Sequence, residues 1–207
     1  MAEIPNRSRA MPVLHWCRMT TLSIRIVQLA CLGLLLVAGG PVALADQRDP
    51  RLPALFERLR ATDNADIARL TEFMIWQIWD ESGARDIDQL MQEGEEAMER
   101  EDFAAAEASF NAVIEAQPDF AEGWNRRATM YYLSGDYPRS LADIDHVLEL
   151  EPRHFGAISG LGVVNMALER IEAARDAFER VLSLYPLNLP AQENLKLIKK
   201  RLDESDI

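Results

Sequence analysis

The sequence predicts an all-α protein built as a stack of helical hairpins, and three observations support this class. Residue types repeat with a period of 34 residues through the middle of the chain. Pro118, Pro152 and Pro186 stand one period apart, and each is placed to end a helix because proline cannot donate the backbone hydrogen bond. Apolar residues between the prolines recur at helical spacing. A fixed period between 20 and 50 residues is typical of stacked repeats.

Four further columns of the repeat keep their residue type from unit to unit. The first helix of each unit carries a small residue: Gly94, Ala128 and Gly162. The second helix carries a small residue (Ala106, Ser140 and Ala174), a bulky apolar residue (Phe110, Ile144 and Phe178) and a valine (Val113, Val147 and Val181). We expect the first column to let the two helices of a unit approach closely, and the bulky column to fill the space between helices.

The second unit resembles the tetratricopeptide repeat (TPR) through Trp124, Ala128, Tyr131 and Pro152, which follow the pattern W-x3-A-x2-Y with a closing proline. The other two units lack the tryptophan and the tyrosine, and carry in their places Leu90 and Ala97, and Ile158 and Asn165. The resemblance implies a right-handed α-solenoid in which each unit is a pair of antiparallel helices. It also implies a scaffold that binds other proteins.

The resemblance and the flanking sequence divide the chain into seven segments. We expect a signal peptide (1–45), a linker (46–53), an N-terminal helical pair (54–82), three TPR units (87–120, 121–154 and 155–188) and a C-terminal capping helix with its tail (189–207).

The first segment has the features of a secretory signal peptide. Four arginines precede an uncharged run, residues 26–45, which ends in Ala43-Leu44-Ala45. A basic front, an apolar middle and an A-x-A end predict cleavage before Asp46 and a periplasmic or secreted protein. The alternative is an inner-membrane protein anchored by residues 26–45, because about 20 apolar residues can span a bilayer.

The N-terminal helical pair is expected at residues 54–60 and 65–80. The second of these helices carries apolar residues at three-residue steps, and we expect them to form its inward face: Ile67, Leu70, Phe73, Trp76 and Trp79. The pair is either a degenerate repeat or a cap that closes the end of the stack. Trp76 and Trp79 are candidates for core packing or for a ligand-stacking pair.

The helices of the three units follow from the period and the proline positions. We expect them at residues 88–99 and 102–116, 121–134 and 137–150, and 155–168 and 171–184, with a last helix at 190–203. Asp86, with Gln89 three residues on, has the spacing of a helix-capping box, and Asp119 with Glu122 repeats that signal. In the last helix we expect Leu195, Ile198 and Leu202 to face inward, and its lysines outward.

Charge and cysteine content exclude several classes of function. The whole chain has a formal charge of −12; without residues 1–45 it keeps 18 basic and 33 acidic residues, a charge of −15. Nucleic-acid binding needs a basic face, so the balance excludes it and favours basic partners. Both cysteines, Cys17 and Cys31, lie in the expected leader. The remainder therefore has neither a disulfide nor a thiolate metal site.

The sequence offers no catalytic constellation after the expected leader. His146 stands beside Asp143 and Asp145, which we expect on a solvated face, and His154 is expected to be exposed at a helix start. Residues 160–162 contain a Gly-x-Gly fragment without the rest of a phosphate-binding motif. We therefore expect neither an enzyme nor a metal or cofactor site.

The resemblance places the binding groove on the first helix of each unit. By position, the groove is expected to include Asp88, Met91, Glu95, Met98, Glu122, Asn125, Thr129, Tyr132, Ser159, Val163 and Met166. Some TPR proteins clamp a carboxylate with Lys and Asn in this groove, but Met91 and Glu95 stand at those places here. The groove is thus expected to be acidic at one end and apolar, with methionines, at the other.

The predicted function is a non-enzymatic protein-interaction scaffold of the bacterial cell envelope. Its partner is expected to be a peptide or helix with basic and apolar residues, and neither nucleic acid nor, after cleavage, a membrane. The alternatives are a self-associating structural protein and a membrane-anchored TPR adaptor.

Overall fold

The computed structural model describes residues 47–205, which contain only helices as regular structure. This confirms the all-α prediction. The expected leader, with Cys17 and Cys31, lies outside the described residues. The helices are α2 (Leu52–Ala61), α3 (Ala65–Asp80), α4 (Arg85–Glu99), α5 (Phe103–Ala116), α6 (Ala121–Leu133), α7 (Tyr137–Leu150), α8 (Phe155–Ala167), α9 (Ile171–Leu184) and α10 (Leu189–Ser205). Within residues 47–205, none of the helices combines the length and apolarity that crossing a membrane requires.

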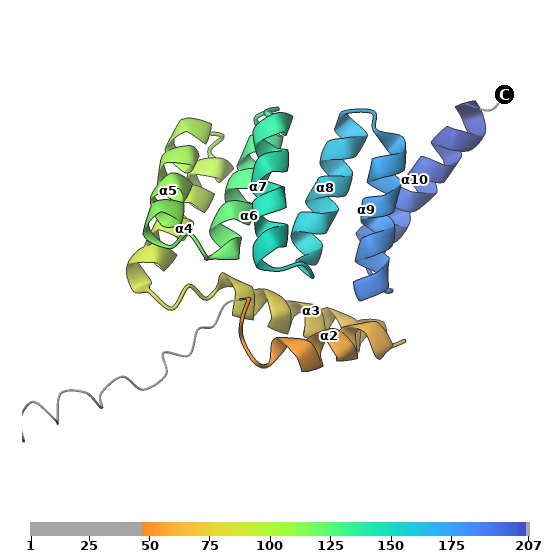
Figure 1. Cartoon of the computed structure of the whole chain (residues 1–207), viewed down its shortest axis with the longest axis horizontal. Helices are drawn as coiled ribbons and strands as arrows, with labels where there is room; N and C mark the ends of the chain where they lie inside the picture. Colours follow the sequence, from red (N-terminus) through yellow and green to blue (C-terminus); the bar gives the residue numbers. More distant parts are fainter. Residues whose placement is uncertain (1–46, 206–207) are drawn as a thin grey trace, which may run out of the picture. The chain divides into compact units, whose positions relative to one another are not determined.

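Helices α4 to α9 form three hairpins that stack side by side, and α10 packs on the last of them (Figure 1). The two helices of a hairpin lie as close together as the small residues of the repeat predict. A Cβ atom on Gly94 would lie 2.5 Å from the Phe110 ring, and one on Gly162 would lie 2.7 Å from the Phe178 ring. In the second unit the Ser140 hydroxyl donates to the Ala128 carbonyl at 2.8 Å. Any larger side chain in the first column would therefore push the paired helices apart.

Side-chain caps stand at some of the helix starts, and their positions differ in part from the prediction. Asp102 and Asp136 accept backbone N–H groups at the starts of α5 and α7. Asp86 is not a cap, because α4 begins at Arg85 and its start has no side-chain cap. Phe120, rather than Asp119, precedes α6.

The N-terminal pair, α2 and α3, lies across the ends of the stacked helices and does not form another hairpin of the stack (Figure 1). α3 contacts α6, and α2 contacts α9. Aromatic contacts hold the pair in place: the Phe56 ring lies 6.3 Å from Phe155, and the Trp76 ring lies 5.4 Å from Phe155. The pair is thus a brace along the stack, so core packing accounts for its two tryptophans.

The prediction of which residues of α3 face inward is wrong for the first half of the helix. Ile67, Leu70 and Phe73 are 38%, 54% and 57% exposed, and only the later part of the stripe reaches the core. Each three-residue step turns a 3.6-residue helix by about 60°, so the stripe rotates from solvent at Ile67 to the core at Trp79. The buried face consists instead of Ala68, Thr71, Ile75, Ile78 and Trp79.

Residues 47–51, expected as a linker, are packed against the turn between α5 and α6. The Arg48 guanidinium bonds the Asp119 carboxylate at 2.8 Å, and the side chain of Gln47 is buried beside the same turn. Asp49 is also buried, where it accepts from the Arg51 backbone and side chain. The segment therefore adds to the contacts that hold α2 on the stack.

Candidate functional site

Two pockets lie along the first helices of the repeat units, where the groove is expected. The acidic pocket has a volume of about 260 Å³ and is lined by Asp80, Asp88, Met91, Gln92, Glu95 and Arg126. The apolar pocket has a volume of about 140 Å³ and is lined by Asn125, Ala128, Thr129, Tyr132, Ser140, Ile144, Gly156, Gly160, Val163 and Val164. Asn125 and Arg126 are consecutive residues of α6, so the two pockets are neighbours along that helix.

The acidic pocket is organised around the guanidinium of Arg126. Its nitrogens lie 3.0 Å from Asp80, 3.2 Å from Glu95 and 2.8 Å from Glu122. Burial works against the charge of Arg126, but Glu122, Glu95 and Asp80 together raise its pKa. Asp88 adds another carboxylate on the same wall. Carboxylates therefore outnumber cations around this pocket, and a positively charged group would be attracted there.

Asp80 joins the brace to this pocket, because it is the last residue of α3. Its pKa is raised, first by burial and then by the charge of Glu122, while Arg126 opposes the rise. A cation entering the pocket would favour the ionised form of Asp80.

Glu122, expected in the groove, is buried and forms internal contacts instead. It is 1% exposed, and its carboxylate accepts two bonds from the Asn125 amide, at 3.0 and 3.1 Å. It also lies 3.0 Å from Nε2 of His154. Because Nδ1 of His154 accepts the Ala157 N–H, Nε2 carries the ring proton and donates to Glu122. This carboxylate therefore supports the pocket from behind and does not line it.

His154 was expected to be exposed, but its side chain is fully buried. It caps the start of α8, and the Trp79 ring stacks on it at a centroid distance of 4.1 Å. The repeat offers a signal that could have revealed the cap: Asn188, one period later, likewise accepts the Ala191 N–H at the start of α10. The tryptophan contact has no such signal, because α3 lies outside the repeat.

The apolar pocket is open between α6 and α8. Thr129 is exposed at its rim, Tyr132 and Val163 are half-buried, and Ala128 and Ile144 form its floor. Of the expected groove residues, seven line one of the two pockets: Asp88, Met91, Glu95, Asn125, Thr129, Tyr132 and Val163. Ser159 is half-buried outside both, and Met98 and Met166 pack against buried clusters. The apolar end is thus lined by Tyr, Ile and Val instead of methionines.

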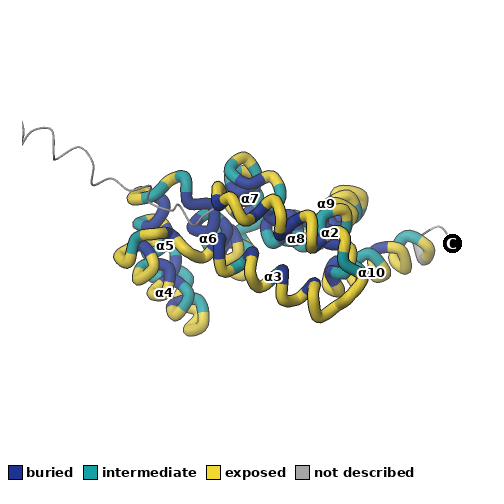
Figure 2. The backbone as a smooth tube through the Cα atoms, turned by 90° about the horizontal axis from the view of Figure 1, so that it is seen from below, coloured by how far each residue is buried: buried dark blue, intermediate teal, exposed yellow. Residues whose placement is uncertain are grey.

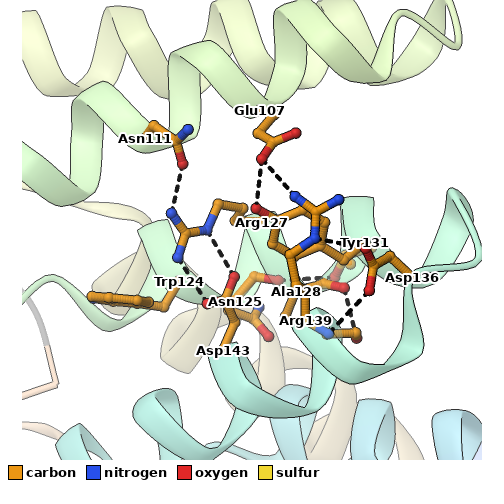
Figure 3. Close-up of polar contacts among 12 residues, drawn as sticks. Glu107, Asn111, Trp124, Asn125, Arg127, Ala128, Tyr131, Asp136, Arg139 and Asp143 are labelled. Carbon is orange, nitrogen blue, oxygen red and sulfur yellow. Dashed lines mark hydrogen bonds and ion pairs between the residues drawn. The ribbon is translucent and has the colours of Figure 1, made fainter.

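A second polar cluster joins α5, α6 and α7 (Figure 3). Arg127 donates to both oxygens of Asp143 at 2.8 Å, and Tyr131 donates to Glu107 at 2.8 Å. Asp143, expected to be solvated, is only 4% exposed because Arg127 covers it. The hydrogen bond that Arg127 donates to Asp143 is the main reason that the pKa of Arg127 is raised. This cluster ties the first unit to the second.

His146 contacts an aromatic ring and one carboxylate. Its ring packs 4.0 Å from that of Trp124, and its Nδ1 lies 3.5 Å from Glu149. Among residues 47–205, no three His, Cys, Asp or Glu side chains are grouped to hold an ion.

Comparison with known proteins identifies the repeat. The model of the tetratricopeptide repeat matches residues 91–145 and 131–188. A TPR repeat-containing protein of Rhizobium etli is 38% identical over 152 residues, which are 73% of this chain and 74% of that protein. The small glutamine-rich tetratricopeptide repeat-containing protein 2 of Mycosarcoma maydis is 25% identical over 57% of this chain, which spans only 34% of that protein.

Solved structures show the same fold at low sequence identity. The first TPR domain of Spaghetti (RPAP3), bound to the HSP90 peptide SRMEEVD, has a TM-score of 0.55 and 24% identity, over 57% of this chain and 94% of that one. The Sgt2 TPR domain of Aspergillus fumigatus has a TM-score of 0.56 and 21% identity, over 59% of this chain and 83% of that one. The family model, the Rhizobium relative and the shared solenoid lead to one conclusion: the chain belongs to the tetratricopeptide repeat family.

Proposed function

We propose that the protein is a non-enzymatic scaffold that holds a segment of another protein along α4, α6 and α8, and that it works in the bacterial cell envelope. The observation that carries this proposal is the neighbouring pair of pockets, one acidic and one apolar. A segment with a basic residue next to apolar residues would satisfy both at once. The expected leader at residues 1–45 supports the envelope as the location.

The related structures support a protein segment as the ligand. The TPR domain of Spaghetti is bound to a peptide of HSP90, and the TPR2B domain of yeast Sti1 is solved in a complex with pHsp70. The Spaghetti peptide, SRMEEVD, ends in acidic residues. The acidic pocket of this chain would repel such an end, because Glu95 and Asp88 line it. We therefore propose a partner segment of the opposite charge.

The proposal is tested by affinity capture from an envelope extract of the source cells, followed by a binding measurement with the captured protein. Asp88→Asn combined with Glu95→Gln is expected to weaken binding about 10-fold, because the pocket loses two of its charges. Val163→Asp, which changes a residue of the apolar pocket, is expected to weaken binding as well.

The matched control is Glu115→Gln, which removes an exposed carboxylate from α5. It is expected to leave binding unchanged. Equal binding by the double variant and the wild type would contradict the proposal, as would a loss of the same size in the control.

A further inference from the structure

Arg126 places a positive charge of the protein itself inside the acidic pocket. Two of the carboxylates beside its guanidinium, Asp80 and Glu95, also line that pocket. The side chain of Arg126 is 32% exposed, so it is within reach of a bound segment. A second cation on these carboxylates would lie close to the guanidinium, and like charges at about 4 Å repel each other. A basic residue of the partner therefore competes with Arg126 for the same two carboxylates.

Two consecutive arginines of α6, a helix that is buried or half-buried over most of its length (Figure 2), are held very differently. Arg127 donates to both oxygens of Asp143 at 2.8 Å, the paired geometry that makes arginine–carboxylate contacts strong. Arg126 donates one hydrogen bond, from a terminal nitrogen to Asp80 at 3.0 Å, and its covered Nε makes none within the described part of the chain. Arg126 is therefore the arginine that a competing cation releases more easily.

Glu122 keeps the guanidinium paired when it leaves the pocket carboxylates. It lies behind the pocket, one helical turn before Arg126, at 2.8 Å from its Nε. Asn125 and His154 hold this carboxylate in place from the other side. A buried arginine that lost every carboxylate would be costly, but the contact with Glu122 remains. The pocket can thus exchange its own cation for another without leaving a buried charge unpaired.

We propose that Arg126 is an internal competitor: it occupies the acidic pocket of the free protein and yields Asp80 and Glu95 to a basic residue of the bound segment. This inference rests on the function proposed above. A free cation gains little, because it only replaces a cation of equal charge. A segment whose apolar residues also fill the neighbouring apolar pocket gains the further binding that the exchange requires. Arg126 therefore makes recognition depend on both pockets at once.

The test is an NMR titration of the full chain with two capped peptides of about 12 residues. One peptide has a single lysine with leucine and valine on each side, and its twin has glutamine in place of the lysine. Arg126→Gln is expected to bind the lysine peptide about 10-fold more tightly than the wild type, because no guanidinium has to leave the carboxylates. Its affinity for the glutamine twin is expected to stay within about 2-fold of the wild type.

Two further variants separate competition inside the pocket from the general charge of the protein. Arg126→Lys keeps a cation in the pocket, so its affinity for the lysine peptide is expected within about 3-fold of the wild type. Arg100→Gln removes an exposed cation at the end of α4, outside the pocket, and is expected to change the affinity less than about 2-fold. An equal gain in Arg100→Gln would overturn the proposal. So would weaker binding by Arg126→Gln, because Arg126 would then hold the segment.

A measurement on the wild type does not depend on how a variant folds. The Nε–H resonance of Arg126, assigned through bonds in isotope-labelled protein, is expected to shift when the lysine peptide binds and to stay in place with the glutamine twin. An unshifted resonance at saturation with the lysine peptide would contradict the internal competition.

The titration also distinguishes failure of this inference from failure of the proposed function. A wild type that prefers the lysine peptide, together with an Arg126→Gln variant that gains nothing, would overturn only the role of Arg126. No preference for lysine in either protein would overturn both proposals, because the acidic pocket would then not select a basic residue.

Discussion

The repeat stack and the N-terminal brace are held by different kinds of contact. In the stack, the same contact recurs at the same repeat position: Gly94 meets Phe110 in the first unit, and Gly162 meets Phe178 in the third. In the brace, each contact occurs once, as when Trp79 stacks on His154 or Tyr185 bonds Glu72. Periodic contacts join neighbours in sequence, whereas the contacts that join the brace to the stack span from 46 positions, between Asp80 and Arg126, to 113 positions, between Glu72 and Tyr185. We therefore expect the stack to be stable by itself and the brace to be stable only on the stack.

Replacing one buried phenylalanine in the stack and one in the brace tests this difference. The larger loss of stability is expected in the stack. Phe178 is 1% exposed and lies between α8 and α9. Phe178→Ala is expected to lower the free energy of unfolding by about 3–5 kcal/mol, because the cavity it leaves is enclosed by the third repeat unit. Chemical denaturation followed by circular dichroism measures this loss. A loss below about 1 kcal/mol would mean that the repeat column is not what holds the hairpins together.

Phe56→Ala removes an equally buried ring from the brace, where Phe56 is 2% exposed and contacts Trp79 and Phe155. We expect α2 and α3 to open locally while the repeats stay folded. Amide hydrogen exchange in α2 and α3 is expected to accelerate about 100-fold, which corresponds to nearly 3 kcal/mol. Amides of α5 to α7 should exchange at their original rates. Equal acceleration in all helices would show that the brace and the stack unfold as one unit.

The smallest expected effect is the pH dependence contributed by Asp80, at the junction of the brace and the stack. Its folded-state pKa is raised above the ordinary 3.8, mainly by burial. Between these two pKa values the folded protein binds more protons than the unfolded chain, so this group lowers the free energy of unfolding as the pH rises. Asp80→Asn is expected to remove this slope. Compared with the wild type, the variant should therefore lose less stability, or gain more, between pH 4 and pH 7 in denaturation experiments. An equal change in both proteins would contradict the assignment.

The sequence predicts the repeat stack better than it predicts the brace. The positions of α4 to α9 agree with expectation within three residues at each end, because the proline and glycine columns recur. The groove prediction depends on this register, which is why seven of its residues line pockets. The period contains no information about α3, so it could not reveal that His154 is covered by Trp79. Glu122 was misplaced for a different reason: its carboxylate turns toward His154, which was expected at the surface.

The burial of Asp143 could not be predicted from hydrophobic periodicity either. It stands one residue before the buried Ile144, and its helical face is polar in sequence. Its burial depends on Arg127, which reaches across from α6 to bind both carboxylate oxygens (Figure 3). Long side chains can cover a neighbouring polar group in this way, and hydrophobic periodicity does not record it. The predicted inward face of α3 was wrong because residues at three-residue steps rotate around the helix and do not stay on one face.

The central claim is that the acidic and apolar pockets together select a protein segment with a basic residue beside apolar ones. Selection of displayed random 12-residue peptides on the protein tests this most directly. The account predicts enrichment of Lys or Arg next to Leu, Val or Ile, and loss of the enriched peptides when Asp88→Asn and Glu95→Gln are combined. Enriched acidic peptides, or basic peptides that bind the double variant as well as the wild type, would contradict it.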